Sequence, residues 1–204
     1  MLTIVHRFLD FIFPPRATEL RVRGLSIGTL LALYQPRTHE SVLYLLPYQT
    51  EAVRALIQEN KFHENTQAAK LLAGILERYL KEKIHQRTIL IPIPLSQLRK
   101  KTRGYNQVEH VLQHLSSIPN LEINTTLLTR AKDTVPQTSL PREARLRNMK
   151  GAFVATVPPG SCEDSTIVII DDVVTTGATL VASRAALAPH LHHTTKIIYL
   201  ALAH

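Results

Sequence analysis

The sequence predicts an α/β fold: a mostly parallel central sheet flanked by helices, with a small N-terminal subdomain. From residue 88 onward, apolar runs of strand length alternate with segments whose apolar residues recur at helical spacing. The chain has 204 residues, of which 45% are hydrophobic and 20% charged, so it can bury a sizeable core without disulfides. We expect an N-terminal subdomain over residues 1–60 and an α/β domain over residues 61–204.

The first 60 residues change pattern twice. Residues 1–15 place their apolar side chains near one face of a short amphipathic helix, which we expect to pack on the core. Residues 17–46 hold short, partly alternating stretches punctuated by glycine and proline, which predict two or three short strands. From Thr50 the period becomes helical, and a helix is predicted over residues 50–62.

The rest of the chain alternates between strand and helix patterns. A long helix is predicted over residues 65–84, with Asn65 or Thr66 as its N-cap. The elements that follow are a strand at 88–94, a loop and a helix at 106–116, a strand at 123–130, a long loop at 131–150, a strand at 166–170, a helix at 179–191 and a strand at 196–203. Ligands of such sheets bind at the carboxyl ends of the strands.

The net charge of +8 is concentrated in two segments. Residues 96–106 contain four basic residues and no acidic one, and residues 142–150 contain four basic residues and one acidic one. Clustering of this kind implies an anionic partner, either a nucleic acid or a small phosphate compound.

Cysteine content and hydropathy exclude several classes of protein. Cys162 is the single cysteine, which rules out intramolecular disulfides and a cysteine-rich zinc module, and it favours a reducing, cytoplasmic compartment. No apolar run reaches the length of about 18 residues that a transmembrane helix needs.

The segment TIVIIDDVVTTGATL, residues 166–180, carries the clearest chemistry. A β-branched strand ends in Asp171 and Asp172, and a short turn leads into the next helix. This turn, Thr175-Thr176-Gly177-Ala178-Thr179, offers hydroxyl groups, backbone N–H groups and a helix N-terminus, which together suit one phosphate monoester. It contains no Gly-Lys-Ser/Thr of the Walker A type, so the phosphate serves as a handle rather than as the group transferred.

Two carboxylates beside an anion site imply a neutral or cationic group between them and the phosphate. Ribose hydroxyls fit the first description and Mg²⁺ the second. The segment therefore predicts a sugar-phosphate site.

These residues also carry a family resemblance. VIIDDVVTTGAT resembles the phosphoribosyl pyrophosphate (PRPP) motif of type I phosphoribosyltransferases. FIFPPR (11–16), LPYQ…LIQENKF (46–62), IPIPLSQLRKKTRGYNQ (91–107) and TRAKDTVPQTSLPREARLRNMKGAF (129–153) are similar to segments of the ComF/GntX branch of that family, in the same order. The chain departs from that branch after Arg16, where the cysteines of a four-cysteine zinc ribbon are missing, so no zinc site is expected and residues 1–60 are expected to form a hood subdomain with a degenerate ribbon.

The resemblance implies roles for individual residues. Asp171 and Asp172 would be the catalytic residues, holding the ribose hydroxyls and binding Mg²⁺ directly or indirectly, and residues 175–179 would hold the 5′-phosphate. Pyrophosphate would be bound by Arg99, Lys100 and Arg103, in the loop after the strand at 88–94, and by Arg145, in the loop 131–150, which would close as a lid.

Two other residues are ambiguous in the sequence. Tyr105 can stack on a base or pack against a helix. Lys61 lies at a helix end and is expected to be exposed to solvent.

The function implied is that of a ComF-like phosphoribosyltransferase. It would bind PRPP or a related ribose 5-phosphate with Mg²⁺ and transfer the phosphoribosyl group to an unknown nitrogenous acceptor, releasing pyrophosphate. The alternative is a non-enzymatic module in DNA uptake or competence that binds DNA or has a regulatory role, with DNA or competence proteins as its partners. Whether the protein is an active enzyme and whether it forms a homodimer stay open at this point.

Overall fold

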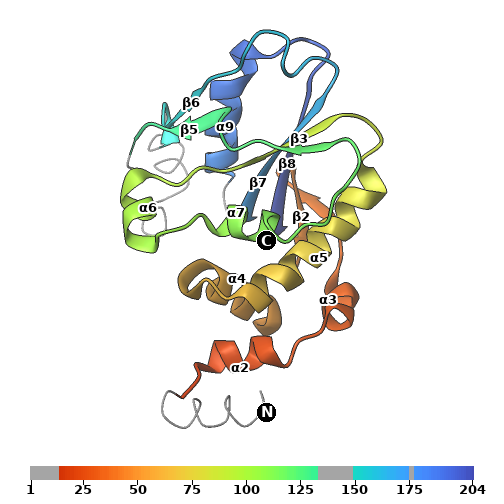
Figure 1. Cartoon of the computed structure of the whole chain (residues 1–204), viewed down its shortest axis with the longest axis vertical. Helices are drawn as coiled ribbons and strands as arrows, with labels where there is room; N and C mark the ends of the chain where they lie inside the picture. Colours follow the sequence, from red (N-terminus) through yellow and green to blue (C-terminus); the bar gives the residue numbers. More distant parts are fainter. Residues whose placement is uncertain (1–13, 133–148, 175–176) are drawn as a thin grey trace.

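The computed structural model describes residues 14–132, 149–174 and 177–204. A six-stranded sheet forms its centre, in the order β1-β2-β8-β7-β3-β4 (Figure 1). Its strands are β1 (Arg37–His39), β2 (Val42–Leu46), β8 (Lys196–Ala203), β7 (Thr166–Val173), β3 (Thr88–Pro92) and β4 (Leu121–Ile123). Every pairing in this sheet is parallel except that of β1 with β2. The predicted fold class, a mostly parallel sheet flanked by helices, is confirmed.

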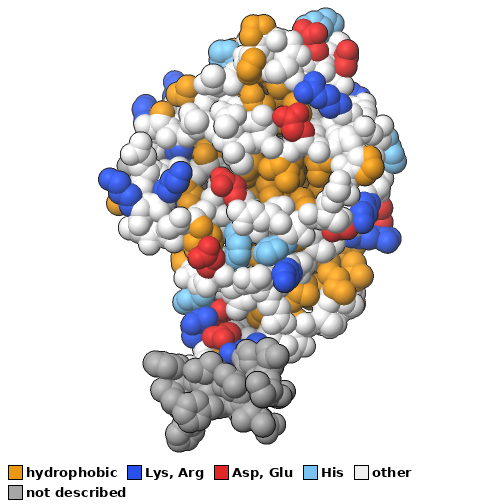
Figure 2. Space-filling model, in the orientation of Figure 1, with side chains coloured by type: hydrophobic (Ala, Val, Ile, Leu, Met, Phe, Trp, Pro, Cys, Tyr) orange, Lys and Arg blue, Asp and Glu red, His pale blue; other side chains and the backbone are white. Residues whose placement is uncertain are grey.

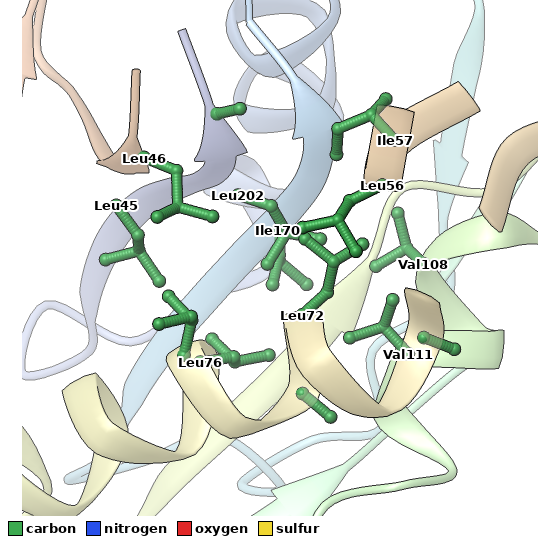
Figure 3. Close-up of a cluster of buried hydrophobic side chains, with 14 of the residues drawn as sticks. Leu45, Leu46, Leu56, Ile57, Leu72, Leu76, Val108, Val111, Ile170 and Leu202 are labelled. Carbon is green, nitrogen blue, oxygen red and sulfur yellow. The ribbon is translucent and has the colours of Figure 1, made fainter. Parts of the chain in front are cut away.

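Helices cover both faces of the sheet. On one face, α4 (Glu51–His63), α5 (Thr66–Lys83) and α7 (Gln107–Leu112) share a core with the side chains of β2, β7 and β8. Figure 3 shows Leu56, Leu72 and Val111 from these helices pointing toward Ile170 and Leu202 of the sheet. On the other face lie α9 (Ala178–Leu187) and a two-stranded sheet of β5 (Leu128–Arg130) and β6 (Phe153–Ala155).

Helix α5 forms where the sequence predicts it, for the expected reasons. Its buried residues recur at helical spacing and include Leu72, Ile75 and Leu76. Asn65 is the N-cap, and its side-chain oxygen accepts a hydrogen bond of 3.0 Å from the backbone N–H of Ala68.

The two or three short strands predicted over residues 17–46 are confirmed only in part. Residues 42–46 form β2, but residues 17–33 form two short helices, α2 (Ala17–Arg23) and α3 (Ile27–Leu33), at one end of the molecule in Figure 1. Each helix buries one side chain completely, Val22 in α2 and Leu30 in α3. The buried positions therefore do not alternate as they would along a strand with one face in the core.

The remainder of the predicted N-terminal subdomain is continuous with the central sheet. Strand β2 pairs with β8, and the predicted boundary between residues 60 and 61 falls inside α4. The division into two domains stays a prediction, and the helix predicted over residues 1–15 lies almost wholly outside the described residues.

The predicted strand over 123–130 is also wrong as a single element. It is divided between β4 in the central sheet and β5 in the small sheet. The side-chain oxygen of Asn124 accepts hydrogen bonds from the backbone N–H groups of Thr126 and Leu127, both at 3.0 Å, and this turn separates the two strands. Most of the predicted loop 131–150 lies outside the described residues.

Among the described helices, none combines the length and the apolar character that a membrane crossing requires.

Candidate functional site

The candidate site lies where the direction of the sheet's connections reverses. Strands β3 and β7 are neighbours, but the chain leaves β3 toward α7 on one face and leaves β7 toward α9 on the other. The N–H of Ile93 donates to the carbonyl of Ile170 at 2.9 Å, so the pairing continues to the residue before Asp171. In open α/β sheets, a crevice for ligands forms outside the carboxyl ends of two such strands.

Asp171 and Asp172 end β7 beside this crevice, and each has one oxygen tied to the local backbone. The Asp171 Oδ1 accepts from the Asp172 N–H at 2.8 Å, and the Asp172 Oδ1 accepts from the Val173 N–H at 2.9 Å. Asp172 is only 3% exposed.

The two carboxyl groups differ in their ionisation. Burial, and then the negative charge of Asp172, raises the pKa of Asp171 to about 8. Burial also works to raise the pKa of Asp172, but the positive charge of Lys61 and the hydrogen bonding of the carboxylate together outweigh burial, so the pKa of Asp172 is lowered. The two carboxyl groups titrate as a coupled pair, and Lys61 favours the ionised form of Asp172.

Lys61 is a site residue that the sequence analysis missed. Its Nζ lies 3.0 Å from the Asp172 Oδ2, and its side chain is 29% exposed, so the expectation of a solvent-exposed lysine is wrong. No local signal identifies this contact, because the two residues are far apart in the sequence. The only indication was a resemblance of the segment LIQENKF to ComF proteins.

The two residues before Lys61 hold other parts of the chain. Glu59 is fully buried and accepts two hydrogen bonds from the Arg16 guanidinium, at 2.8 and 3.0 Å, and one from the Thr18 hydroxyl at 2.6 Å. The Asn60 Nδ2 donates to the Gln107 carbonyl at 2.9 Å. The C-terminal end of α4 thus contacts α2, the first residue of α7 and the carboxylate pair.

The predicted phosphate turn is described in part. Thr175 and Thr176 lie outside the described residues. Gly177 has φ of +65°, a conformation that favours glycine, and it caps α9 without any side-chain hydrogen bond at the cap. Ala178 is 2% exposed, so only its backbone N–H is suited to a ligand. Thr179 lies half-buried in the first turn of α9 and already makes an interaction.

The predicted pyrophosphate residues belong to a helix rather than a loop. Residues Gln97–Arg103 form α6, because the Ser96 side chain caps its N-terminus and Gly104, with φ of +85°, ends it. Arg99 and Arg103 lie one turn apart on α6. Lys100 lies beside them and lines a cavity described below. Arg145 lies outside the described residues.

Among the predicted pyrophosphate residues, Arg103 interacts electrostatically with Asp171 and Asp172. Burial lowers the pKa of its guanidinium, whereas the negative charges of Asp172 and Asp171 act to raise it. It also lies 5.5 Å from the ring centroid of Phe62, the neighbour of Lys61. The structure thus gathers Arg103, Lys61 and the aspartates.

Tyr105 and Asn106 have structural partners. The Tyr105 hydroxyl donates to the Asn60 carbonyl at 2.5 Å and accepts from the Glu64 N–H at 2.8 Å, so the side chain is fixed at the end of α4. Asn106 caps α7, and its Nδ2 donates to the Ile93 carbonyl at 3.0 Å. The segment RGYNQ therefore fixes α6 and α7 relative to α4 and β3.

A cavity of about 680 Å³ lies against α6, and neither aspartate is among the described residues that line it. Gln97, Lys100, Lys101 and Gly104 share one face of the helix and line it, and Arg130 lies across from them. Figure 2 shows Lys and Arg side chains standing out over α6. The cavity and the carboxylate pair are thus distinct places on the molecule.

The donor set at the end of β7 fits a magnesium ion. Mg²⁺ is held by one or two carboxylates together with substrate oxygens, and the buried Asp172 Oδ2 accepts no hydrogen bond of good geometry. Within the described ranges, no cluster of three or more His, Cys, Asp or Glu residues could hold a metal ion by itself. Such an ion would therefore need ligand or water oxygens to complete its coordination.

Comparisons with known proteins agree with the features above. The chain is 32% identical to competence protein F of Haemophilus influenzae over 146 residues, which cover 68% of this chain and 62% of that protein. It is 34% identical to the DNA utilization protein YhgH of Escherichia coli O157:H7 over 133 residues, which cover 61% of this chain and 56% of that protein. The chain thus spans about three fifths of the length of these relatives. No protein-family model matches it.

Among solved structures, a hypoxanthine phosphoribosyltransferase from Staphylococcus aureus aligns with 70% of this chain and 69% of its own, with a TM-score of 0.39 and 13% identity. The chain is therefore similar in sequence to competence protein F and to the YhgH proteins, and its mostly parallel sheet carries an acidic doublet and a glycine turn at the end of β7.

Proposed function

We propose that the protein binds PRPP, or a related ribose 5-phosphate, together with Mg²⁺ at the carboxyl ends of β3 and β7. We further propose that it transfers the phosphoribosyl group to a nitrogenous acceptor with release of pyrophosphate. The observation that carries the proposal is the position of Asp171 and Asp172, at a strand end next to the reversal point of the sheet and one turn before the N-terminus of α9.

Each part of the ligand has a matching group in the protein. The backbone N–H groups of the first turn of α9 suit the 5′-phosphate, because Gly177 caps the helix without a side chain. Asp171 and Asp172 accept hydrogen bonds from the ribose hydroxyls and hold Mg²⁺. Arg103 and Arg99 supply positive charge to the pyrophosphate on the adjacent side of the crevice.

Catalysis in this arrangement consists of positioning and charge stabilisation. Loss of pyrophosphate leaves positive charge on the ribose ring and places negative charge on the leaving oxygens. The arginines stabilise the leaving group, and the negative charge of Asp172 lies beside the ring. Bound Mg²⁺ supplies further neutralisation of the pyrophosphate.

Ligand-dependent stabilisation tests binding. At a PRPP concentration about 100-fold above Kd, with Mg²⁺ present, the native state gains about 2.7 kcal/mol, which raises Tm by several degrees. Asp171→Asn keeps the acceptor for the Asp172 N–H and should abolish the gain, whereas Glu163→Gln, at an exposed acid outside the site, should keep it. A gain that is the same in Asp171→Asn would refute the site. Release of pyrophosphate with candidate bases then tests transfer.

A second candidate function is DNA binding in DNA uptake or competence. The relatives' names favour it, and so does the basic lining of the cavity beside α6, to which Lys100, Lys101 and Arg130 contribute. Fluorescence anisotropy with a labelled single strand tests it. Salt-sensitive binding that is lost in Lys100→Gln/Lys101→Gln and kept in Asp171→Asn supports this function, and the reverse pattern contradicts it.

A further inference from the structure

The contact between Lys61 and Asp172 poses a problem for any ligand of the carboxylate pair. Asp172 is 3% exposed, its Oδ1 is occupied by the Val173 N–H, and its Oδ2 faces the Lys61 ammonium at 3.0 Å. In the part of the chain that the structure describes, that ammonium is the ion-pair partner of Asp172. A second cation can therefore coordinate Oδ2 only after the ammonium has moved away.

Lys61 has both the freedom and a direction in which to move. Its side chain is 29% exposed and ends a flexible four-carbon stem, so the ammonium can reach solvent without unfolding α4. The next residue, Phe62, is 61% exposed and packs under Arg103, which is the cation proposed above for pyrophosphate. An ammonium leaving Asp172 on this side enters the space beside Arg103.

Charge balance favours such a movement when a ligand is bound. In the free protein, Lys61 compensates the negative charge of a buried carboxylate, which would otherwise be costly. When a divalent cation occupies the pair, the lysine is in excess there, and like charges separated by a few ångströms repel. A polyanion beside Arg103 then offers the lysine a new partner.

We propose that Lys61 is an exchangeable counter-ion: it competes with the divalent cation for Asp172 in the free protein and contacts the pyrophosphate when the ligand is bound. This inference rests on the proposed function and deepens it. It makes the protein bind metal and anion together in preference to metal alone, because the metal must displace the lysine and the anion stabilises the displaced lysine.

Two binding measurements on the whole chain test the inference, and neither depends on activity. The first titrates MnCl₂ alone, with free Mn²⁺ measured by electron paramagnetic resonance. The second titrates pyrophosphate by calorimetry into protein whose carboxylate pair is already saturated with Mn²⁺. Lys61→Met should bind Mn²⁺ about tenfold more tightly than wild type and pyrophosphate about tenfold more weakly. Lys70→Met, at an exposed lysine on α5, should change neither affinity.

The opposite signs of the two changes separate this role from a structural one. If Lys61 only supported the site, Lys61→Met would weaken both ligands, and that result overturns the inference. Lys61→Arg provides a second test that retains the buried ion pair: a guanidinium should hold Asp172 more firmly and weaken Mn²⁺ binding severalfold. Unchanged or tighter Mn²⁺ binding by Lys61→Arg also overturns it.

Failure of the proposed function has a different signature. If wild type binds neither Mn²⁺ nor PRPP with Mn²⁺, the carboxylate pair is not a ligand site and both proposals fall. If wild type binds both but Lys61→Met has the wild-type affinities for Mn²⁺ and pyrophosphate, only the role of Lys61 is overturned.

Discussion

Asn60 is expected to be among the polar residues whose loss destabilises the fold most. Its Nδ2 donates to the Gln107 carbonyl at 2.9 Å, and its Oδ1 lies 2.9 Å from the His110 Nδ1. All three residues are buried. Asn60→Ala removes both hydrogen bonds but keeps the backbone carbonyl that the Tyr105 hydroxyl uses, so the substitution isolates the contribution of the amide side chain.

The magnitude follows from the two contacts. Each lost hydrogen bond costs about 1 kcal/mol, and leaving the His110 and Gln107 partners buried and unpaired adds to this, for a total of about 2–4 kcal/mol. In a chain of this size, a loss of about 3 kcal/mol lowers Tm by roughly 6–12 °C. Burial is the main cause that lowers the pKa of His110. The imidazole that loses its hydrogen-bond partner in Asn60→Ala is therefore expected to be neutral.

The assay is urea unfolding followed by circular dichroism, with Gln58→Ala as the control. Gln58 lies two residues earlier on α4 and is exposed, so its replacement should change stability by no more than about 0.5 kcal/mol. If Asn60→Ala and Gln58→Ala unfold at the same urea concentration, the end of α4 is not held by this amide.

Two further predictions concern Glu59 and Gly104. Hydrogen bonds from Arg16 and Thr18 outweigh the effect of burial and lower the pKa of Glu59 to about 2, below its ordinary value of 4.5. The stability gained from Glu59 is therefore fully present above about pH 4.5 and is lost as the pH falls toward 2. In a plot of the urea midpoint against pH, Glu59→Gln should therefore make the decrease on the acid side less steep. A decrease as steep as that of wild type would contradict the ion pair. Gly104→Ala should lower the free energy of unfolding by about 1–2 kcal/mol, because residue 104 has φ of +85°, which a residue with a β-carbon rarely adopts. The loss would come from this backbone conformation, since a β-carbon at Gly104 would meet no atom within 4 Å. Calorimetric unfolding measures the change, and an unchanged stability would show that the left-handed cap is not required.

Local pattern was sufficient for much of the fold. The apolar strands β3, β7 and β8 and the amphipathic helix α5 each bury residues at the spacing that their sequences present. Short elements with few buried residues were not predictable in this way. In α2 and α3, a single fully buried side chain in each gives too little periodicity to separate a helix from a strand.

The site was predictable only where it is contiguous in the sequence. Asp171, Asp172 and Gly177 lie on one strand and turn, so their chemistry could be inferred together. Lys61 comes from a helix more than 100 positions away, and its pairing with Asp172 depends on how α4 packs against the sheet. Likewise, Arg103 and Lys100 are equivalent in sequence, but the fold places Arg103 where the charges of the aspartates act on it, and it places Lys100 in the lining of the cavity beside α6.

The most direct test of the account is a crystal structure of the protein with PRPP and Mg²⁺. The account predicts the 5′-phosphate on the backbone N–H groups of Gly177 and Thr179, the ribose and the metal ion at Asp171 and Asp172, and the Lys61 ammonium displaced from Asp172. A ligand bound instead in the cavity lined by Lys100 and Lys101, with the ion pair of Lys61 and Asp172 intact, would contradict it.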